Sequence, residues 1–132
     1  MTKISSDNWR ELPIEGWNSR TFVAYLTHLT EEKFGVTYEP RGAGTKSQRW
    51  SREMGMINNA RKKYGNDVLK QYIRICVENY QPNERYPYLA FAFAWTYMSD
   101  YLPVAQAQVA KDRRDEERRR AAESKELDID FL

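Results

Sequence analysis

The sequence predicts an all-α protein, built as a compact four-helix domain with an N-terminal extended arm and a charged C-terminal helix that ends in a short tail. Three observations lead to this prediction. Apolar residues recur at three- and four-residue spacing over much of residues 18–102. The 6 glycines and 5 prolines of this 132-residue chain mostly punctuate those stretches. Residues 103–125 are rich in Ala, Gln, Glu and Arg, all of which favour helix.

The first element is expected to be an arm, residues 1–17. It shows no helical period, but Trp9 and Trp17 are too apolar for a free tail, so the arm should pack on the body. The first helix should begin at Asn18 or Ser19, either of which can cap it, and end at Gly35.

The second and third helices are expected to be joined tightly at Gly65. Thr45 or Ser47 can cap the second helix, and Asn66 can open the third, which spans residues 67–80. The third helix has the clearest amphipathic pattern in the chain. The apolar stripe of the second helix consists of Trp50, Met54, Ile57 and Tyr64.

The fourth helix is predicted over residues 88–102, which are apolar on nearly every side. Such a helix is normally buried at the centre of a bundle. The run Ala-Phe-Ala-Phe-Ala-Trp within it also alternates as a strand would, but its alanine content and length favour helix. Residues 103–125 then predict a solvated helix projecting from the body, because acid-before-base pairs such as Glu116 and Arg120 follow i,i+4 spacing.

The charge of the chain is strongly segregated. Its net charge is only +2, yet residues 41–63 hold seven cations against one acid, Glu53, a local balance of +6. A basic cluster of this kind is typical of a surface that binds a polyanion such as DNA, single-stranded or duplex. The alternative is a solvated face without a ligand. The candidate nucleic-acid-binding residues are Arg41, Lys46, Arg49, Arg52, Arg61, Lys62 and Lys63.

The glycine-containing loop before the second helix is expected to be a flexible basic connector. Residues 41–46 read Arg-Gly-Ala-Gly-Thr-Lys and lack the order GxxxxGK[ST] of a nucleotide-binding P-loop. Its amides and Lys46 can meet a backbone phosphate.

Catalytic and metal-binding constellations are scarce. The only histidine, His28, has no second His or Cys to complete a ligand set, and it is expected on the surface or at a cap. The only cysteine, Cys76, lies in an apolar helical stretch and is expected to be a buried, inert thiol. We therefore expect no enzyme activity, cofactor or metal. Without a secretory leader or an apolar span, we expect a cytoplasmic protein that does not contact membranes.

The last seven residues, 126–132, alternate acidic and apolar side chains. Leu127, Ile129, Phe131 and Leu132 have no core to join, so they are expected to bind a protein partner, or else to pack back on their own domain. The segment Glu126-Leu-Asp-Ile-Asp-Phe131 resembles the short motif with which bacterial proteins bind the sliding clamp. It is also similar to the acidic tip of bacterial single-strand-binding proteins (SSB).

A longer stretch, residues 50–102, resembles the C-terminal domain of DnaD/DnaB-like replication-initiation proteins and related phage replisome organisers. The likeness lies in a Tyr-Gly joint at residues 64–65, the runs 68–73 and 77–79, and an aromatic run at 88–95. The resemblance implies a small helical module that binds DNA and contacts a helicase or another replication protein.

The first functional hypothesis is therefore a non-enzymatic, nucleic-acid-binding accessory or adaptor of phage or mobile-element DNA replication. Its C-terminal segment would tether a replication protein such as a helicase, sliding clamp or SSB. The alternative is a phage-encoded protein-interaction module, of the anti-CRISPR type or similar, that inhibits a host nucleic-acid enzyme without binding DNA itself. Homo-oligomerisation through Trp9, Trp17 or residues 103–125 is open in either case.

Overall fold

The computed structural model describes the backbone of residues 4–130 and the side chains of residues 4–127. Those residues form helices and turns without a strand, which confirms the all-α prediction. The elements, in chain order, are η1 (Ile14–Gly16), α1 (Ser19–Phe34), α2 (Lys46–Tyr64), α3 (Asn66–Asn79), α4 (Phe91–Tyr97) and α5 (Tyr101–Asp130).

Two capping boxes fix where α1 and α2 begin, as the sequence predicts. The Asn18 side chain accepts from the Thr21 N–H at 3.1 Å, and the Thr21 hydroxyl accepts from the Asn18 N–H. Thr45 and Gln48 form the same reciprocal pair at the start of α2. Gly35 ends α1 in the left-handed region, with φ 71°, where glycine is strongly favoured.

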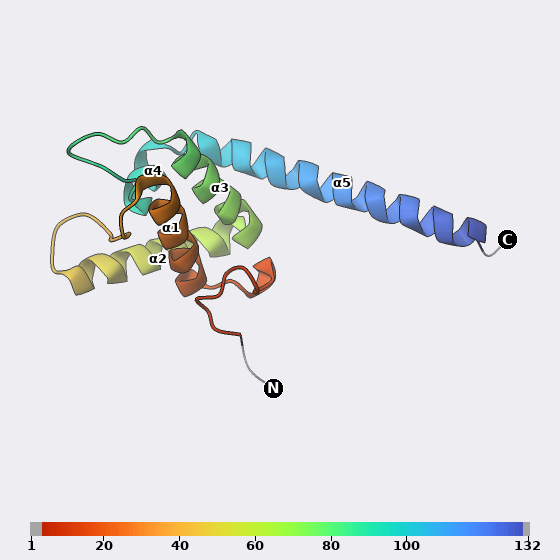
Figure 1. Ribbon diagram of the computed structural model, residues 1–132, viewed down its shortest axis with the longest axis horizontal. Helices are drawn as coiled ribbons and strands as arrows, with labels where there is room; N and C mark the ends of the chain where they lie inside the picture. The colour runs from red at the N-terminus through yellow and green to blue at the C-terminus, as the bar shows by residue number, and fades with distance from the viewer. Residues whose placement is uncertain (1–3, 131–132) are drawn as a thin grey trace.

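Helix α3 is the centre of the body. It follows α2 directly through Gly65, and it contacts α1, α2, α4, α5 and η1 (Figure 1). Its side chains Leu69, Tyr72 and Cys76 are fully buried among Phe22 and Ile57 of the neighbouring helices. Because one helix contacts every other element, the positions of α4 and α5 depend on α3.

The predicted central helix over residues 88–102 is wrong. Residues 80–90 form an irregular connection, α4 spans only seven residues, and the chain turns at residues 98–100 before α5. Phe91 and Ala94 are buried, whereas Phe93 and Tyr97 are exposed. The apolar residues of this run therefore give α4 one buried face and one exposed aromatic face, rather than surrounding a buried central helix.

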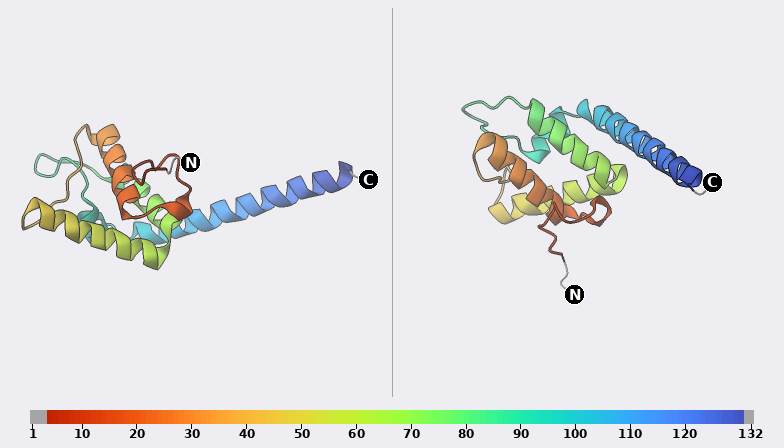
Figure 2. Two further views of the ribbon diagram at one scale, coloured as in Figure 1. Left: turned by 90° about the horizontal axis from the view of Figure 1, so that it is seen from below. Right: turned by 45° about the vertical axis from the view of Figure 1, so that its right-hand side comes forward.

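Helix α5 is one continuous helix, although the sequence predicted three separate parts there, namely the end of the central helix, the charged helix 103–125 and the tail 126–132. It begins at Tyr101, before the expected boundary at Pro103, because proline is tolerated in the first turn, where its missing N–H would have no partner. Ala105 and Val109 are buried where α5 lies along α3. Beyond them α5 projects away from the body, as expected, and it continues to residue 130 through the expected boundary at 125/126 (Figures 1 and 2).

The N-terminal arm packs on the body, but its described part is not extended. It consists of turns and η1, and the Trp17 indole N–H donates to the Leu12 carbonyl at 3.1 Å. Trp9 meets the Tyr25 ring edge-on, with ring centroids 5.0 Å apart. Trp17 is only 2% exposed, so it is unavailable for the homo-oligomer interface considered above.

Candidate nucleic-acid interface

Two of the seven candidate basic residues hold the loop before α2. The Arg49 guanidinium donates to the carbonyls of Gly44, at 2.7 Å, and Pro40, at 3.2 Å. Arg52, one turn later, donates to the carbonyl of Ala43. These bonds fold residues 40–44 back onto the first turns of α2. The predicted flexible connector is therefore a loop tied to its helix, although Arg52 remains exposed at the surface.

Lys46 and Arg41 lie on either side of this loop. The Lys46 ammonium forms an exposed ion pair with Glu39 at 3.2 Å. The Arg41 guanidinium lies over the rings of Tyr86 and Tyr88, 5.0 and 4.4 Å from their centroids, and donates to the carbonyl of Arg85. Arg41 therefore belongs to a cluster of aromatic side chains.

Arg61, Lys62 and Lys63 lie at the other end of α2. Lys62 and Lys63 are exposed, whereas Arg61 is half-buried and its Nε has no hydrogen-bond partner among the described residues. Lys63 lies three turns after Arg52 on the same side of the helix, a separation of about 16 Å at 1.5 Å per residue. The seven residues thus form two basic groups at the ends of one helix. Arg49, Arg52 and Lys63 lie off the apolar stripe of this helix in the sequence and are expected to face solvent together, which is wrong for the half-buried Arg49. Arg41 and Arg61 are half-buried as well.

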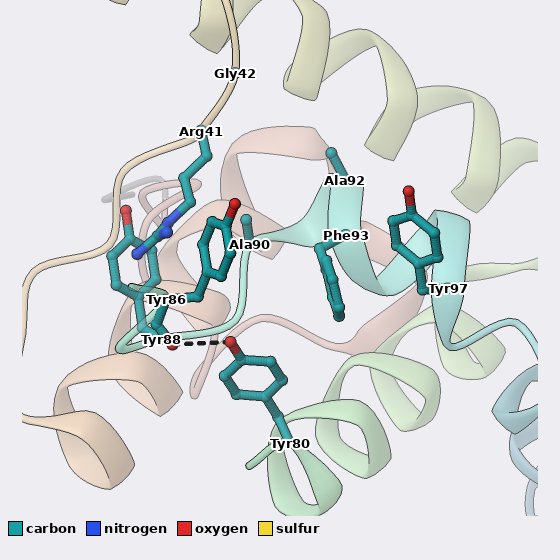
Figure 3. A pocket seen from close by; sticks show the side chains of 9 residues that line it. All are labelled: Arg41, Gly42, Tyr80, Tyr86, Tyr88, Ala90, Ala92, Phe93 and Tyr97. Carbon is teal, nitrogen blue, oxygen red and sulfur yellow. Dashed lines mark hydrogen bonds between the residues drawn. The ribbon is translucent and has the colours of Figure 1, made fainter. Parts of the chain in front are cut away.

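A pocket of about 430 Å³ opens beside the first basic group. It lies between Arg41, the connection of residues 80–90, and α4 (Figure 3). Its wall contains five aromatic rings, which are those of Tyr80, Tyr86, Tyr88, Phe93 and Tyr97. The Tyr80 hydroxyl donates to the carbonyl of Tyr86 at 2.9 Å and holds this connection against the end of α3.

A buried acid lies behind the pocket. Glu53, on the inward side of α2, is 3% exposed, and Tyr38 donates a hydrogen bond to its Oε1. Burial raises the pKa of the Glu53 carboxyl from 4.5 to about 7, against the opposing effect of the Tyr38 hydrogen bond. Its Oε2 has no partner among the described residues. Tyr38 also contacts the Tyr88 ring edge-on, which links this pair to the pocket wall.

The histidine and the cysteine lie where the sequence predicts. His28 lies at the surface, 2.8 Å from the Glu32 carboxylate and 3.2 Å from the Arg10 guanidinium. Cys76 is fully buried, and burial raises the pKa of its thiol to about 11. Within the described residues, no three His, Cys, Asp or Glu side chains converge as metal ligands would. No described helix is both long enough and apolar enough to cross a membrane.

The candidate partner-binding residues lie at and beyond the far end of α5. Leu127 is 60% exposed and contributes to no core. Residue 129 belongs to α5 by its backbone, and the side chain of Ile129 lies outside the description. Phe131 and Leu132 lie outside the described residues altogether. The described part of the tail is thus helical and does not pack back on the domain.

The aromatic pocket is the site that sequence reasoning missed. The predicted central helix over residues 88–102 places Phe93 and Tyr97 in the core, whereas the structure exposes both rings. The run Tyr86-Pro-Tyr88 is a usable signal for part of this pocket, because proline marks turns and loops and so indicates that these two rings lie outside a helix.

We compared the chain with protein-family models, with curated proteins and with solved structures. None of the three comparisons returns a match. Functional inference therefore rests on the residues and their geometry.

Proposed function

We propose that the protein is a non-enzymatic, nucleic-acid-binding accessory of DNA replication in a phage or mobile element. The observation that carries this proposal is the concentration of exposed cations on α2 and its preceding loop, at Lys46, Arg52, Lys62 and Lys63. A phosphate backbone is attracted to so local an excess of positive charge in a chain whose net charge is only +2. The likeness to DnaD/DnaB-like modules around the α2–Gly65–α3 joint supports the assignment to replication.

The second part of the proposal concerns α5. At 30 residues and 1.5 Å per residue this helix is about 45 Å long. Arg113 pairs with Asp67 of α3, and the ion pairs found beyond it among the described residues lie within α5 itself. Such a helix is a stiff spacer that presents Leu127 and the residues after it at a distance from the body. A replication protein bound there is held at high effective concentration near the DNA that α2 binds.

The experiment that tests the first part is binding to labelled single-stranded and duplex DNA, followed by fluorescence anisotropy at about 50–300 mM salt. We expect tight binding at low salt and a steep loss of affinity as salt rises. The variant Lys62→Ala/Lys63→Ala removes two exposed cations that make no ion pair among the described residues. The magnitude of the log–log salt slope should fall by about 1.4 to 1.8, the contribution of two phosphate contacts.

A matched control is Arg114→Ala/Arg118→Ala on the outer part of α5, which removes the same net charge away from α2. If the site is on α2, this variant should keep the wild-type salt slope. If wild-type protein binds neither DNA at the lowest salt, the proposal is overturned, and the alternative becomes a protein-interaction module that inhibits a nucleic-acid enzyme. Truncation after Lys125 tests the second part with purified sliding clamp and SSB: DNA binding should persist while partner binding is lost.

A further inference from the structure

The aromatic pocket concentrates the exposed apolar surface of the protein. Six large apolar side chains are exposed within residues 4–127, and three of them, Tyr86, Phe93 and Tyr97, line this one pocket. They are 41%, 42% and 73% exposed. Single exposed apolar residues need no explanation, but rings gathered around one concavity indicate a binding surface.

The rings of the pocket are held in place without a ligand. Tyr80 is buried, its ring contacts Phe34 edge-on with centroids 5.8 Å apart, and its carbonyl accepts from the Lys33 ammonium at 3.2 Å. Phe93 meets the Tyr80 ring edge-on at 6.0 Å and lies 4.9 Å from the Tyr97 ring. The pocket is therefore preformed, and binding of a flat ligand would cost little conformational entropy, because the side chains of the wall are already ordered.

One side of the pocket is positively charged. Arg41 reaches in between the rings of Tyr86 and Tyr88 (Figure 3), where its guanidinium rests on the faces of those rings and donates to the neutral carbonyl of Arg85, with no acid paired to it among the described residues. The Tyr88 hydroxyl donates to the carbonyl of Glu39 at 2.7 Å, which fixes the ring on which Arg41 rests. A flat apolar interior beside a fixed guanidinium fits a ligand that joins a planar ring to an anion.

The pocket is continuous with the first basic group of α2. Gly42 lines the pocket, and a Cβ placed on Gly42 would lie 3.5 Å from the Arg52 Nη2. A chain that leaves the pocket past Gly42 therefore meets the Arg52 guanidinium. The anionic groups repeated along such a chain would therefore meet one cation after another.

We propose that this pocket takes one unstacked base of a single-stranded nucleic acid, which stacks on Phe93 and Tyr97 while an adjacent phosphate meets Arg41. Bases within a duplex are already stacked and cannot enter such a site, so the pocket makes the protein selective for single strands. This inference rests on the proposed nucleic-acid-binding function, and it adds the strand preference and the residues responsible.

The test compares a labelled oligothymidylate of about 15 nucleotides, within the span of one small binding fold, with a duplex of the same length. Wild-type protein should prefer the single strand. The variant Phe93→Ala/Tyr97→Ala should weaken single-strand binding roughly 5- to 150-fold, the range for one lost base–aromatic stack. Duplex binding and the salt slope should stay at wild-type values, because no cation has been removed.

Three further variants keep the result interpretable. Thr96→Ala changes an exposed residue of the same short helix outside the pocket and should bind as wild type. Phe93→Trp keeps a stacking surface and should retain single-strand binding. Tyr97→Ala alone removes the most exposed ring, so circular dichroism should show an unchanged fold even if the double variant is less stable.

Each outcome separates this inference from the function it rests on. DNA binding that is equal for single strand and duplex, and unchanged by Phe93→Ala/Tyr97→Ala, overturns the pocket assignment and leaves the basic site of α2 standing. A pocket variant that loses binding only to a protein partner also overturns it. Wild-type protein that binds no DNA at low salt overturns the proposed function and this inference together.

Discussion

The Tyr38 hydroxyl donates a hydrogen bond to the buried Glu53 carboxyl and accepts one from the Phe91 N–H at 3.0 Å. Through this hydroxyl three segments meet, namely the connection after α1, the inward side of α2, and the first turn of α4. The Phe91 N–H is one of the donors that a helix start leaves without an intrahelical partner. Glu53 therefore positions α4, and with it one wall of the aromatic pocket.

This pair predicts how stability depends on pH. Burial raises the pKa of Glu53 from 4.5 to about 7, so between those values the folded protein binds more protons than the unfolded chain. The free energy of unfolding should therefore fall as pH rises from 4.5 to 7, by at most about 3 kcal/mol at 1.36 kcal/mol per pKa unit. Urea denaturation across this range measures the slope.

The variant Glu53→Gln keeps an acceptor for Tyr38 but cannot ionise, so its stability should be less dependent on pH over this interval. The matched control is Glu84→Gln, which changes an exposed carboxyl in the connection before α4 and should keep the wild-type slope. An identical slope in wild-type and Glu53→Gln protein would show that Glu53 does not titrate in this range.

Two of the three glycines within residues 41–63, Gly44 and Gly55, should respond in opposite directions to substitution by alanine. Gly55 lies in mid-helix, exposed, with nothing within 4 Å of a Cβ, so Gly55→Ala should stabilise the protein by about 1 kcal/mol. Gly44 has φ +100°, and a Cβ there would lie 2.5 Å from the Gln48 Oε1 that completes the α2 capping box. Gly44→Ala should destabilise by about 1–2 kcal/mol. Urea midpoints measure both, and changes of the same sign would contradict this account.

Local signals in the sequence predicted α1 to α3 well. Four residues begin or end a helix at the positions where the sequence predicts it, because caps and left-handed glycines depend on neighbours within four residues. They are Asn18, Thr45, Gly35 and Gly65. The amphipathic pattern of α3 likewise identified its buried face.

The region after residue 80 could not be predicted in this way. A run rich in apolar residues was interpreted as core, but burial of Phe91 and exposure of Phe93 depend on where α3 and Arg41 lie in space. Pro103 was interpreted as a boundary, although a first turn accommodates it. The basic residues were identified, but the sequence does not show that Arg49 and Arg52 bond to carbonyls of a loop that folds back on them.

Only the first part of α5 should contribute to the stability of the body. Val109 is buried against α3, so Val109→Ala should cost about 2 kcal/mol through lost burial and the cavity left behind. Val104→Ala makes the same chemical change at an exposed position of the same helix and should cost less than about 0.5 kcal/mol. Thermal unfolding of the two variants measures the difference, and equal losses would show that α5 does not pack on α3 as described.

Amide hydrogen exchange should distinguish the basic residues of α2 that hold the preceding loop from those that do not. Arg49 and Arg52 tie the carbonyls of residues 40–44 to the helix, whereas Lys62 and Lys63 make no such bonds among the described residues. Each lost bond is worth about 1 kcal/mol, or about a fivefold increase in local opening. The Thr45 and Gln48 amides should therefore exchange at least fivefold faster in Arg49→Ala/Arg52→Ala than in wild-type protein.

The matched variant Lys62→Ala/Lys63→Ala removes the same charge from the same helix and should leave those two amides at wild-type exchange rates. Because Arg41 lies within the tied loop, the arginine variant should also weaken single-strand binding by more than the lysine variant does. Its effect combines two lost charges with a displaced pocket wall. If both variants exchange at the wild-type rate, Arg49 and Arg52 do not hold the loop and are free to bind phosphate directly.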